Sequence, residues 1–201
     1  DASLREKRWD LAFDKVNGHA QYDGNGFIAD KLQVLHDGAA GVLSLRAGPH
    51  VRDPKQAVEA ELQASVGINS LLDKAGNLAW LKPYMEGRSA WTVALGIPKG
   101  EGASAPTRLQ LRSNLVGTAI NLPEPVRKPA AQPLAASIDM ALPLERGEVG
   151  VTLGNLLSLR SRSDDKQTGV RVQFGGAADA PPANGLVIGG RAGRVDALDW
   201  I

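Results

Sequence analysis

The sequence predicts an all-β protein that contains one short helical insert. Three observations carry this prediction. Apolar residues recur with a period of two, turn-forming residues separate these stretches, and a single segment has helical spacing. Successive side chains of a strand point to opposite faces of a sheet, so a period of two is typical of a sheet with one buried face. We expect about ten strands, joined mostly by short turns in an up-and-down antiparallel order.

The clearest alternation lies at residues 57–66, where small and aliphatic side chains share one face and polar side chains the other. The apolar set is Val58, Ala60, Leu62, Ala64 and Val66. The same pattern predicts further strands at 91–97, 109–111, 136–142, 149–153 and 170–174. Weaker alternation predicts strands at 9–13, 28–34 and 43–47, and a final one, interrupted by glycines, at 186–201.

Residues that favour chain reversal separate these stretches. Gly and Asn tolerate positive φ, and an Asp side chain can accept hydrogen bonds from its own turn. Such residues predict reversals at 17–18, 23–26, 37–38, 52–54, 99–102, 163–165 and 180–185.

Two segments depart from the strand pattern. Residues 69–85 have helical spacing, with Asn69 or Ser70 as the expected N-cap and Gly76 as the end of the first half. The apolar residues change phase at 113–115, which predicts a β-bulge because a bulge shifts the alternation by one residue.

We divide the chain into a first strand group at 1–66, a helical insert at 67–86 and a second strand group at 87–201. The second group contains a proline-rich crossing segment at 122–133, which removes ladder donors and should leave the sheet. The chain has 201 residues, begins at Asp1 without Met and ends on Trp200 and Ile201. We therefore expect residues 1–201 to be one internal segment of a longer protein.

Composition excludes several classes of function. The 23 Lys and Arg residues balance 22 Asp and Glu residues, so the chain has no basic field that would attract nucleic acid. It contains no Cys, which excludes disulfides, thiol nucleophiles and thiolate zinc sites. No apolar run approaches the roughly 18 residues that would span a bilayer.

No set of residues has the spacing of a catalytic, metal or cofactor site. His19, His36 and His50 are far apart and lie beside turns, and no nucleophile elbow occurs. We therefore expect no enzyme activity and no cofactor. A glycan-processing enzyme would need two converging carboxylates, but the pairs Glu59/Glu61 and Asp164/Asp165 have the pattern of a solvated surface.

A basic set lies around one predicted hairpin, and the intervening acidic residues indicate a mixed solvated surface. Its members are Arg160, Arg162, Lys166 and Arg171.

The apolar face of the predicted sheet is the candidate binding surface. One short helix is too little to cover about ten strands, so this face must be buried in another way. Its residues fit either a closed core or an open groove. The candidates are Val58, Leu62, Val66, Trp91, Val93, Leu95, Leu109, Leu111, Ile138, Met140, Val151, Leu153, Val172 and Phe174.

One motif resembles a known family. The residues SNLVG at 113–117 lead into LPEPVRKPA at 122–130, which resembles the Leu-Pro-x-Pro-x-x-Lys-Pro-Ala turn of the YhdP family of AsmA-like proteins. The surrounding order is also similar, from the turn-rich strands at 16–34, through INSLL at 68–72 and the Gly87-x-x-x-Trp91 strand, to the glycine-rich strand and Leu-Asp-Trp at 185–200.

The resemblance implies a fold and a function. The fold is a strongly curved antiparallel sheet, a taco-like β-groove, within a periplasmic body that an inner-membrane helix anchors in Gram-negative bacteria. The implied role is transport of phospholipid from the inner to the outer membrane, with acyl chains shielded in the groove. The implied partners are phospholipid and neighbouring segments of the same chain. The alternative is a closed β-sandwich that serves as a scaffold or interaction module in the envelope.

Overall fold

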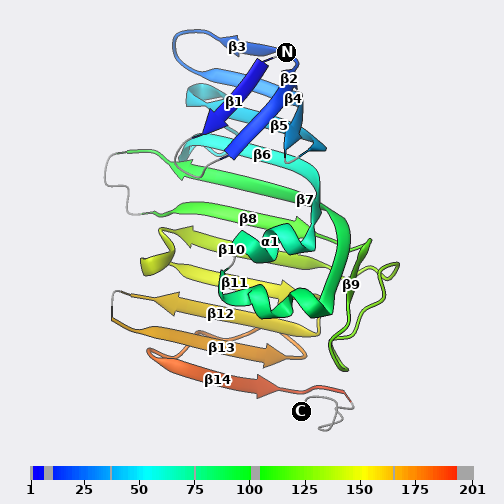
Figure 1. The fold of residues 1–201 in the computed structure, drawn as a ribbon. Coiled ribbons are helices and arrows are strands. Elements are labelled where there is room, and N and C mark those ends of the chain that lie inside the picture. The colour runs from blue at the N-terminus through cyan, green and yellow to red at the C-terminus, as the bar shows by residue number, and fades with distance from the viewer. Residues whose placement is uncertain are drawn as a thin grey trace. The chain divides into compact units, whose positions relative to one another are not determined.

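The computed structural model describes residues 2–6, 11–36, 38–74, 76–100, 105–164 and 166–193. Its strands form one hydrogen-bonded sheet of 14 strands, which confirms the all-β class (Figure 1). The strand order is β1-β2-β4-β5-β6-β7-β8-β10-β11-β12-β13-β14, with β3 paired to β4 and β9 paired to β7. This order is open rather than circular, so the alternative prediction of a closed sandwich is wrong.

The strands have the following bounds: β1 Ala2–Glu6, β2 Leu11–Asn17, β3 Ala20–Tyr22, β4 Phe27–His36, β5 Ala39–Ala47, β6 Gln56–Gly67, β7 Met85–Pro98, β8 Thr107–Ser113, β9 Thr118–Ile120, β10 Ala136–Leu142, β11 Glu148–Leu153, β12 Leu157–Ser163, β13 Thr168–Phe174 and β14 Gly185–Gly190. The helices are α1 Ile68–Lys74 and the 3₁₀ segments η1 Gly48–His50, η2 Gly76–Tyr84 and η3 Leu144–Arg146.

Predictions at several positions fall outside the described residues. These are Trp9 of the first predicted strand, Asp37 and residues 101–102 of two predicted turns, Asp165 of the second carboxylate pair, and the Leu-Asp-Trp close at 198–200.

The chain forms two compact units, which we describe in turn. Unit 1 contains Asp1–Ser65 and Trp91–Gln110, and unit 2 contains Val66–Ala90 and Leu111–Ile201. In unit 1, a packed cluster of buried apolar side chains joins β2, β4 and β5. Its members are Phe13, Ala29, Leu32, Val34 and Leu43. Two register shifts bend this part of the sheet, one in β2 where Lys15 has a φ of 50° and one in β4 where Lys31 has a φ of 55°.

In unit 2, strands β10 to β13 form an antiparallel meander, as predicted. The next strand departs from the prediction, because β14 pairs with β13 in parallel. The proline- and glycine-rich residues 180–185 predict a reversal. They instead belong to a connection that runs from Gly175 to Asn184 and returns the chain to the end of the sheet where β13 begins. Parallel neighbours require such a crossover.

The predicted bulge at 113–115 is wrong. Strand β8 ends at Ser113, and the chain turns through Leu115 and Gly117, which have φ values of 51° and 97°. It then forms β9, which pairs with the first residues of β7. A bulge and a strand exit both change the phase of the apolar alternation, so the sequence pattern fits either one.

The helical insert is confirmed, and it consists of α1 followed by η2. The predicted caps are displaced, since α1 begins at Ile68 and therefore contains Asn69 and Ser70. The proline-rich segment leaves the sheet as expected. It keeps contact with β9 through an isolated bridge between Ile120 and Lys128, and the N–H of Gly117 donates to the carbonyl oxygen of Ala130 at 2.8 Å.

Candidate functional site

Strands β10 to β14 of unit 2 align apolar side chains in rows that run across the strands. In the central row Ile138 lies opposite Val151, Val151 opposite Leu159, Leu159 opposite Val172, and Val172 beside Ile188. Cross-strand partners on one face lie close enough for their side chains to pack.

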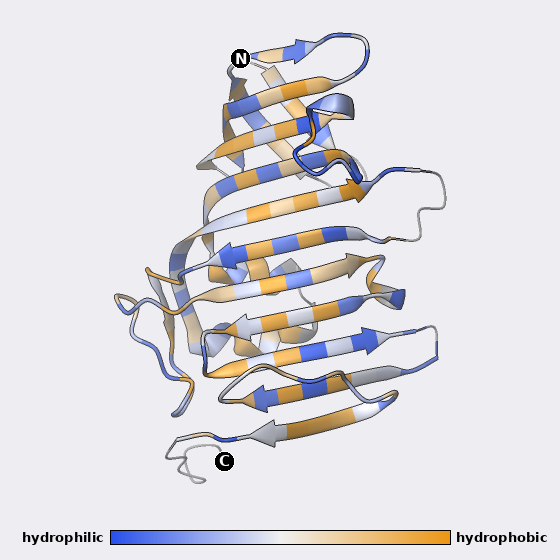
Figure 2. Cartoon of the chain, turned by 180° about the vertical axis from the view of Figure 1, so that it is seen from behind, coloured by the Kyte–Doolittle hydropathy of each residue, from blue (hydrophilic) through white to orange (hydrophobic). Residues whose placement is uncertain are grey.

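Two flanking rows continue the same face. One contains Ala136, Leu153, Leu157 and Phe174, and the other contains Met140, Val149, Ser161, Val170 and Leu186. Apart from Ser161, every side chain in the three rows is apolar. We call these residues the apolar rows. Along β11, β12 and β13 the hydropathy alternates from one residue to the next (Figure 2).

Most side chains of the apolar rows are only partly covered. Ala136 is buried, Leu186 and Ile188 are exposed, and the others are half-buried. The core cluster of unit 1 contrasts with this, because its five members are all buried. Apolar side chains in a completed core pack at the density of an organic crystal. The apolar rows therefore form an apolar face with incomplete cover.

The connection between β13 and β14 lies on the opposite, polar face. The guanidinium Nε of Arg171 donates to the carbonyl oxygen of Ala180 at 2.8 Å, and a Cβ at Gly169 would lie 1.6 Å from the oxygen of Pro182. Figure 1 shows this connection behind the strands and α1 and η2 in front of them, and Figure 2 shows the reverse. The helical insert therefore lies on the side of the apolar rows.

The structure places the fourteen predicted groove residues in both units. Ile138, Met140, Val151, Leu153, Val172 and Phe174 meet in the apolar rows. Val66 and Leu111 also belong to unit 2, where Val66 is half-buried and Leu111 is buried.

The other six predicted groove residues belong to unit 1. They are Val58, Leu62, Trp91, Val93, Leu95 and Leu109. Leu62 lies opposite Leu43 and packs against the core cluster, and Val58 lies opposite Ala47. Trp91 is buried, whereas Val93, Leu95 and Leu109 are half-buried. Because buried side chains offer a ligand little surface, Trp91 and Leu111 are the weakest of the fourteen candidates.

Sequence reasoning missed part of the apolar rows. Leu157 and Leu159 alternate with serine and arginine in a stretch without a long apolar run, so the period of two was present but weak. Leu186 and Ile188 lie in a strand that we expected, although its glycines hid which side chains share the apolar face.

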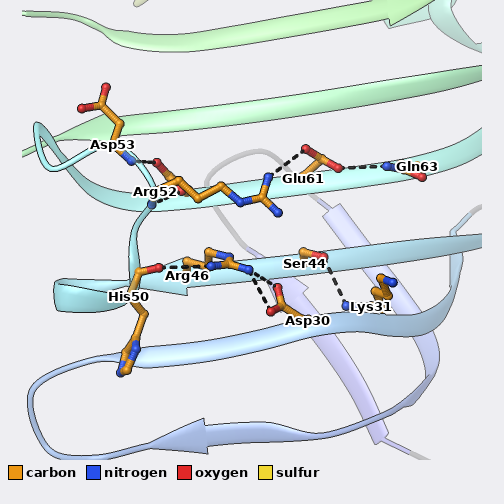
Figure 3. A network of polar contacts seen from close by, with 10 residues as sticks. Asp30, Lys31, Ser44, Arg46, His50, Arg52, Asp53, Glu61 and Gln63 are labelled. Carbon is orange, nitrogen blue, oxygen red and sulfur yellow. Dashed lines mark hydrogen bonds and ion pairs between the residues drawn. The ribbon is translucent and has the colours of Figure 1, made fainter.

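In unit 1, a network of polar contacts lies on the face of the sheet opposite the core cluster (Figure 3). Arg46 binds both carboxylate oxygens of Asp30 at 2.8 Å, and Arg52 lies 3.9 Å from Glu61. The Glu59 carboxylate accepts the backbone N–H groups of Arg52 and Asp53. The network borders a pocket of about 350 Å³, whose lining includes Arg108 and Gln56. Most of its charged groups bind one another or the backbone.

The histidines are separated, as the sequence indicates. The Nδ1 atom of His36 lies 3.0 Å from the carbonyl oxygen of Ala12, and Nε2 of His50 lies 3.0 Å from Asp23. Within the described ranges, no three His, Asp or Glu side chains are grouped in a way that could hold a metal ion. Nor does any helix in these ranges have the length and apolarity to cross a membrane.

The proline-rich segment is held by a buried lysine. The Lys128 ammonium group donates to the carbonyl oxygens of Leu115 at 2.8 Å, Thr118 at 2.6 Å and Pro129 at 3.0 Å. Desolvation by burial lowers the pKa of Lys128 below its usual value. The lysine of the Leu-Pro-x-Pro-x-x-Lys-Pro-Ala motif therefore fixes the turn to the strand that precedes it.

The sequence profile of a family described as "YhdP protein" matches residues 1–201, the whole chain. The chain belongs to the YhdP family. This confirms the resemblance drawn from the motif at 113–130. Neither a curated protein nor a solved structure gives a match. The YhdP family assignment and the incompletely covered apolar rows are thus the two findings from which a function can be argued.

Proposed function

We propose that this chain is a non-enzymatic segment of an envelope lipid-transport protein, and that its apolar face shields the acyl chains of phospholipids. The observation that carries the proposal is the set of apolar rows, which remain partly exposed across five strands. Membership of the YhdP family fits a lipid-transport type of envelope protein.

The chemistry of an acyl chain suits this face. Each CH₂ group removed from water contributes about 0.8 kcal/mol, and it needs no specific polar partner. A long apolar surface can therefore bind lipid tails without a catalytic or metal-binding constellation. In this proposal the protein lies in the periplasm, is anchored to the inner membrane through other parts of the chain, and moves phospholipid towards the outer membrane.

Site-specific photo-cross-linking tests the proposal. A benzophenone side chain at Val172 lies in the central apolar row, and one at Arg160 on the neighbouring strand lies on the polar face. In cells that produce the full-length protein, we expect a phospholipid adduct at position 172 and none at position 160, as read by mass spectrometry. Equal labelling at both positions, or none at 172, would contradict lipid shielding and favour a scaffold role.

A further inference from the structure

The helical insert exposes large apolar side chains. In η2, Leu78 is 39% exposed, Trp80 is 61% exposed and Tyr84 is 43% exposed. A tryptophan or tyrosine side chain buries roughly 150–250 Å² when it finds a partner, so their exposure leaves a large hydrophobic contribution unused. The one charged residue of η2, Lys82, already pairs with Asp73 of α1.

The insert is fixed at several points within unit 2. Ile68 and Leu72 of α1 are buried, and the ion pair between Lys82 and Asp73 holds η2 to α1. At the other end, the carbonyl oxygen of Tyr84 accepts the N–H of Asn121 at 2.7 Å. These contacts hold η2 in place, while its apolar side chains remain exposed to solvent.

The location of the insert indicates what these side chains contact. It lies on the same side of unit 2 as the apolar rows, whose own side chains are incompletely covered (Figures 1 and 2). One flexible apolar ligand on this side would remove both surfaces from water. A folded protein partner would instead be expected to meet a polar, solvent-accessible rim, whereas the one charged side chain of η2, Lys82, is already paired with Asp73.

We infer that η2 is a strap that forms the second wall of the lipid site, with Leu78, Trp80 and Tyr84 in contact with acyl chains that lie against the apolar rows. This inference rests on the proposed function and adds a separate set of residues to it. Trp80 is the most exposed of the three and is the residue on which the strap is most directly tested.

The test compares benzophenone cross-linking at three positions of the full-length protein in cells. Trp80 probes the strap, Val172 probes the apolar rows, and Tyr22 of β3 in unit 1 is a control that is 76% exposed. We expect phospholipid adducts at positions 80 and 172 and no adduct at position 22. Circular dichroism of each purified variant establishes that it is folded.

The other outcomes separate the two proposals. Lipid at 172 without lipid at 80 would overturn the strap and leave the proposed function intact. Lipid at neither position would overturn both, and a protein adduct at 80 would identify η2 as a protein-docking element instead. Labelling at 22 as strong as at 80 would show non-specific insertion of exposed aromatic positions into lipid, and would also overturn the strap.

Discussion

The ammonium nitrogen of Lys128 lies 2.6 Å from the carbonyl oxygen of Thr118, ten residues earlier in the chain. Lys128 is only 2% exposed, and three carbonyl oxygens accept its donors. Their partial negative charges replace the water that the cation loses on burial. A lysine in this motif thus has a structural role in joining the proline-rich segment to β9.

Replacing Lys128 with Met should destabilise the protein. Met preserves much of the side-chain length but removes all three donors, so buried carbonyl oxygens lose partners at a cost of about 1–3 kcal/mol. Urea denaturation measures the change in the free energy of unfolding. Arg127→Met is the matched control, because Arg127 is adjacent and exposed. Equal stability of the two variants would contradict the structural role of Lys128.

The contribution of Asp23, in the turn after β3, to the stability of the folded protein should be lost in acid. The backbone N–H groups of Asn25 and Gly26 donate to the Asp23 carboxylate, and they hold its pKa below 3.8 together with the His50 side chain. A carboxylate with a lowered folded pKa contributes stability above its unfolded pKa, and this contribution is lost as the pH falls through the folded value.

The pH dependence can be measured by comparing the wild type with Asp23→Ala. The wild type should be more stable at neutral pH, and the difference should shrink as the pH falls below 3.8. Asp23→Asn is the control, since its amide oxygen still accepts hydrogen bonds but does not titrate in this range. A difference between the wild type and Asp23→Ala that stayed constant down to pH 2 would rule out the carboxylate as its source.

Two glycines on the polar face should respond differently to alanine. At Gly169 a Cβ would lie 1.6 Å from the oxygen of Pro182, whereas at Gly150 no heavy atom lies within 4 Å. Gly169→Ala should displace the connection before β14 and cost about 1–3 kcal/mol, while Gly150→Ala should change stability by less than about 1 kcal/mol. Denaturation measures both values. Faster amide exchange confined to β14 would locate the damage, and similar stabilities would contradict the packing of this connection.

Leu109 and Leu111 are two residues apart on one strand but differ in cover. Leu109 and Val93 are both half-buried. The variants Leu109→Arg and Val93→Arg should therefore leave the protein folded, and each should abolish the cross-linking of lipid to it. Leu111 is buried, so Leu111→Arg should cost about 3 kcal/mol or more because it places a charge in an apolar site. Thermal denaturation and cross-linking yield separate the outcomes. Unfolding of Leu109→Arg would assign Leu109 to a core.

The sequence was sufficient to predict much of the fold because local chemistry determined it. Alternation at 57–66 predicted β6, helical spacing predicted α1 and η2, and three prolines predicted the exit from the sheet. The direction of β14 was not predictable in this way. Proline and glycine stop a strand, but the same residues serve a reversal and a crossover, and only the pairing partner distinguishes the two.

The candidate site was predictable only in part. Periodicity identifies which residues share a face, and it correctly grouped Ile138 with Met140 and Val172 with Phe174. It cannot show which face remains uncovered, because cover depends on contacts between distant segments. For this reason the buried Trp91 and the half-buried Val172 had the same sequence signal.

The insert that carries Trp80 has no loose end, because it continues directly from β6 and directly into β7, which are neighbours in the sheet. Lifting the insert from the strands would break the hydrogen bond between Asn121 and Tyr84 and would expose Ile68 and Leu72. A hydrocarbon tail would have to slide in endwise between the insert and the strands. Entry would then select for slender, flexible molecules, and a bulky headgroup would stay outside.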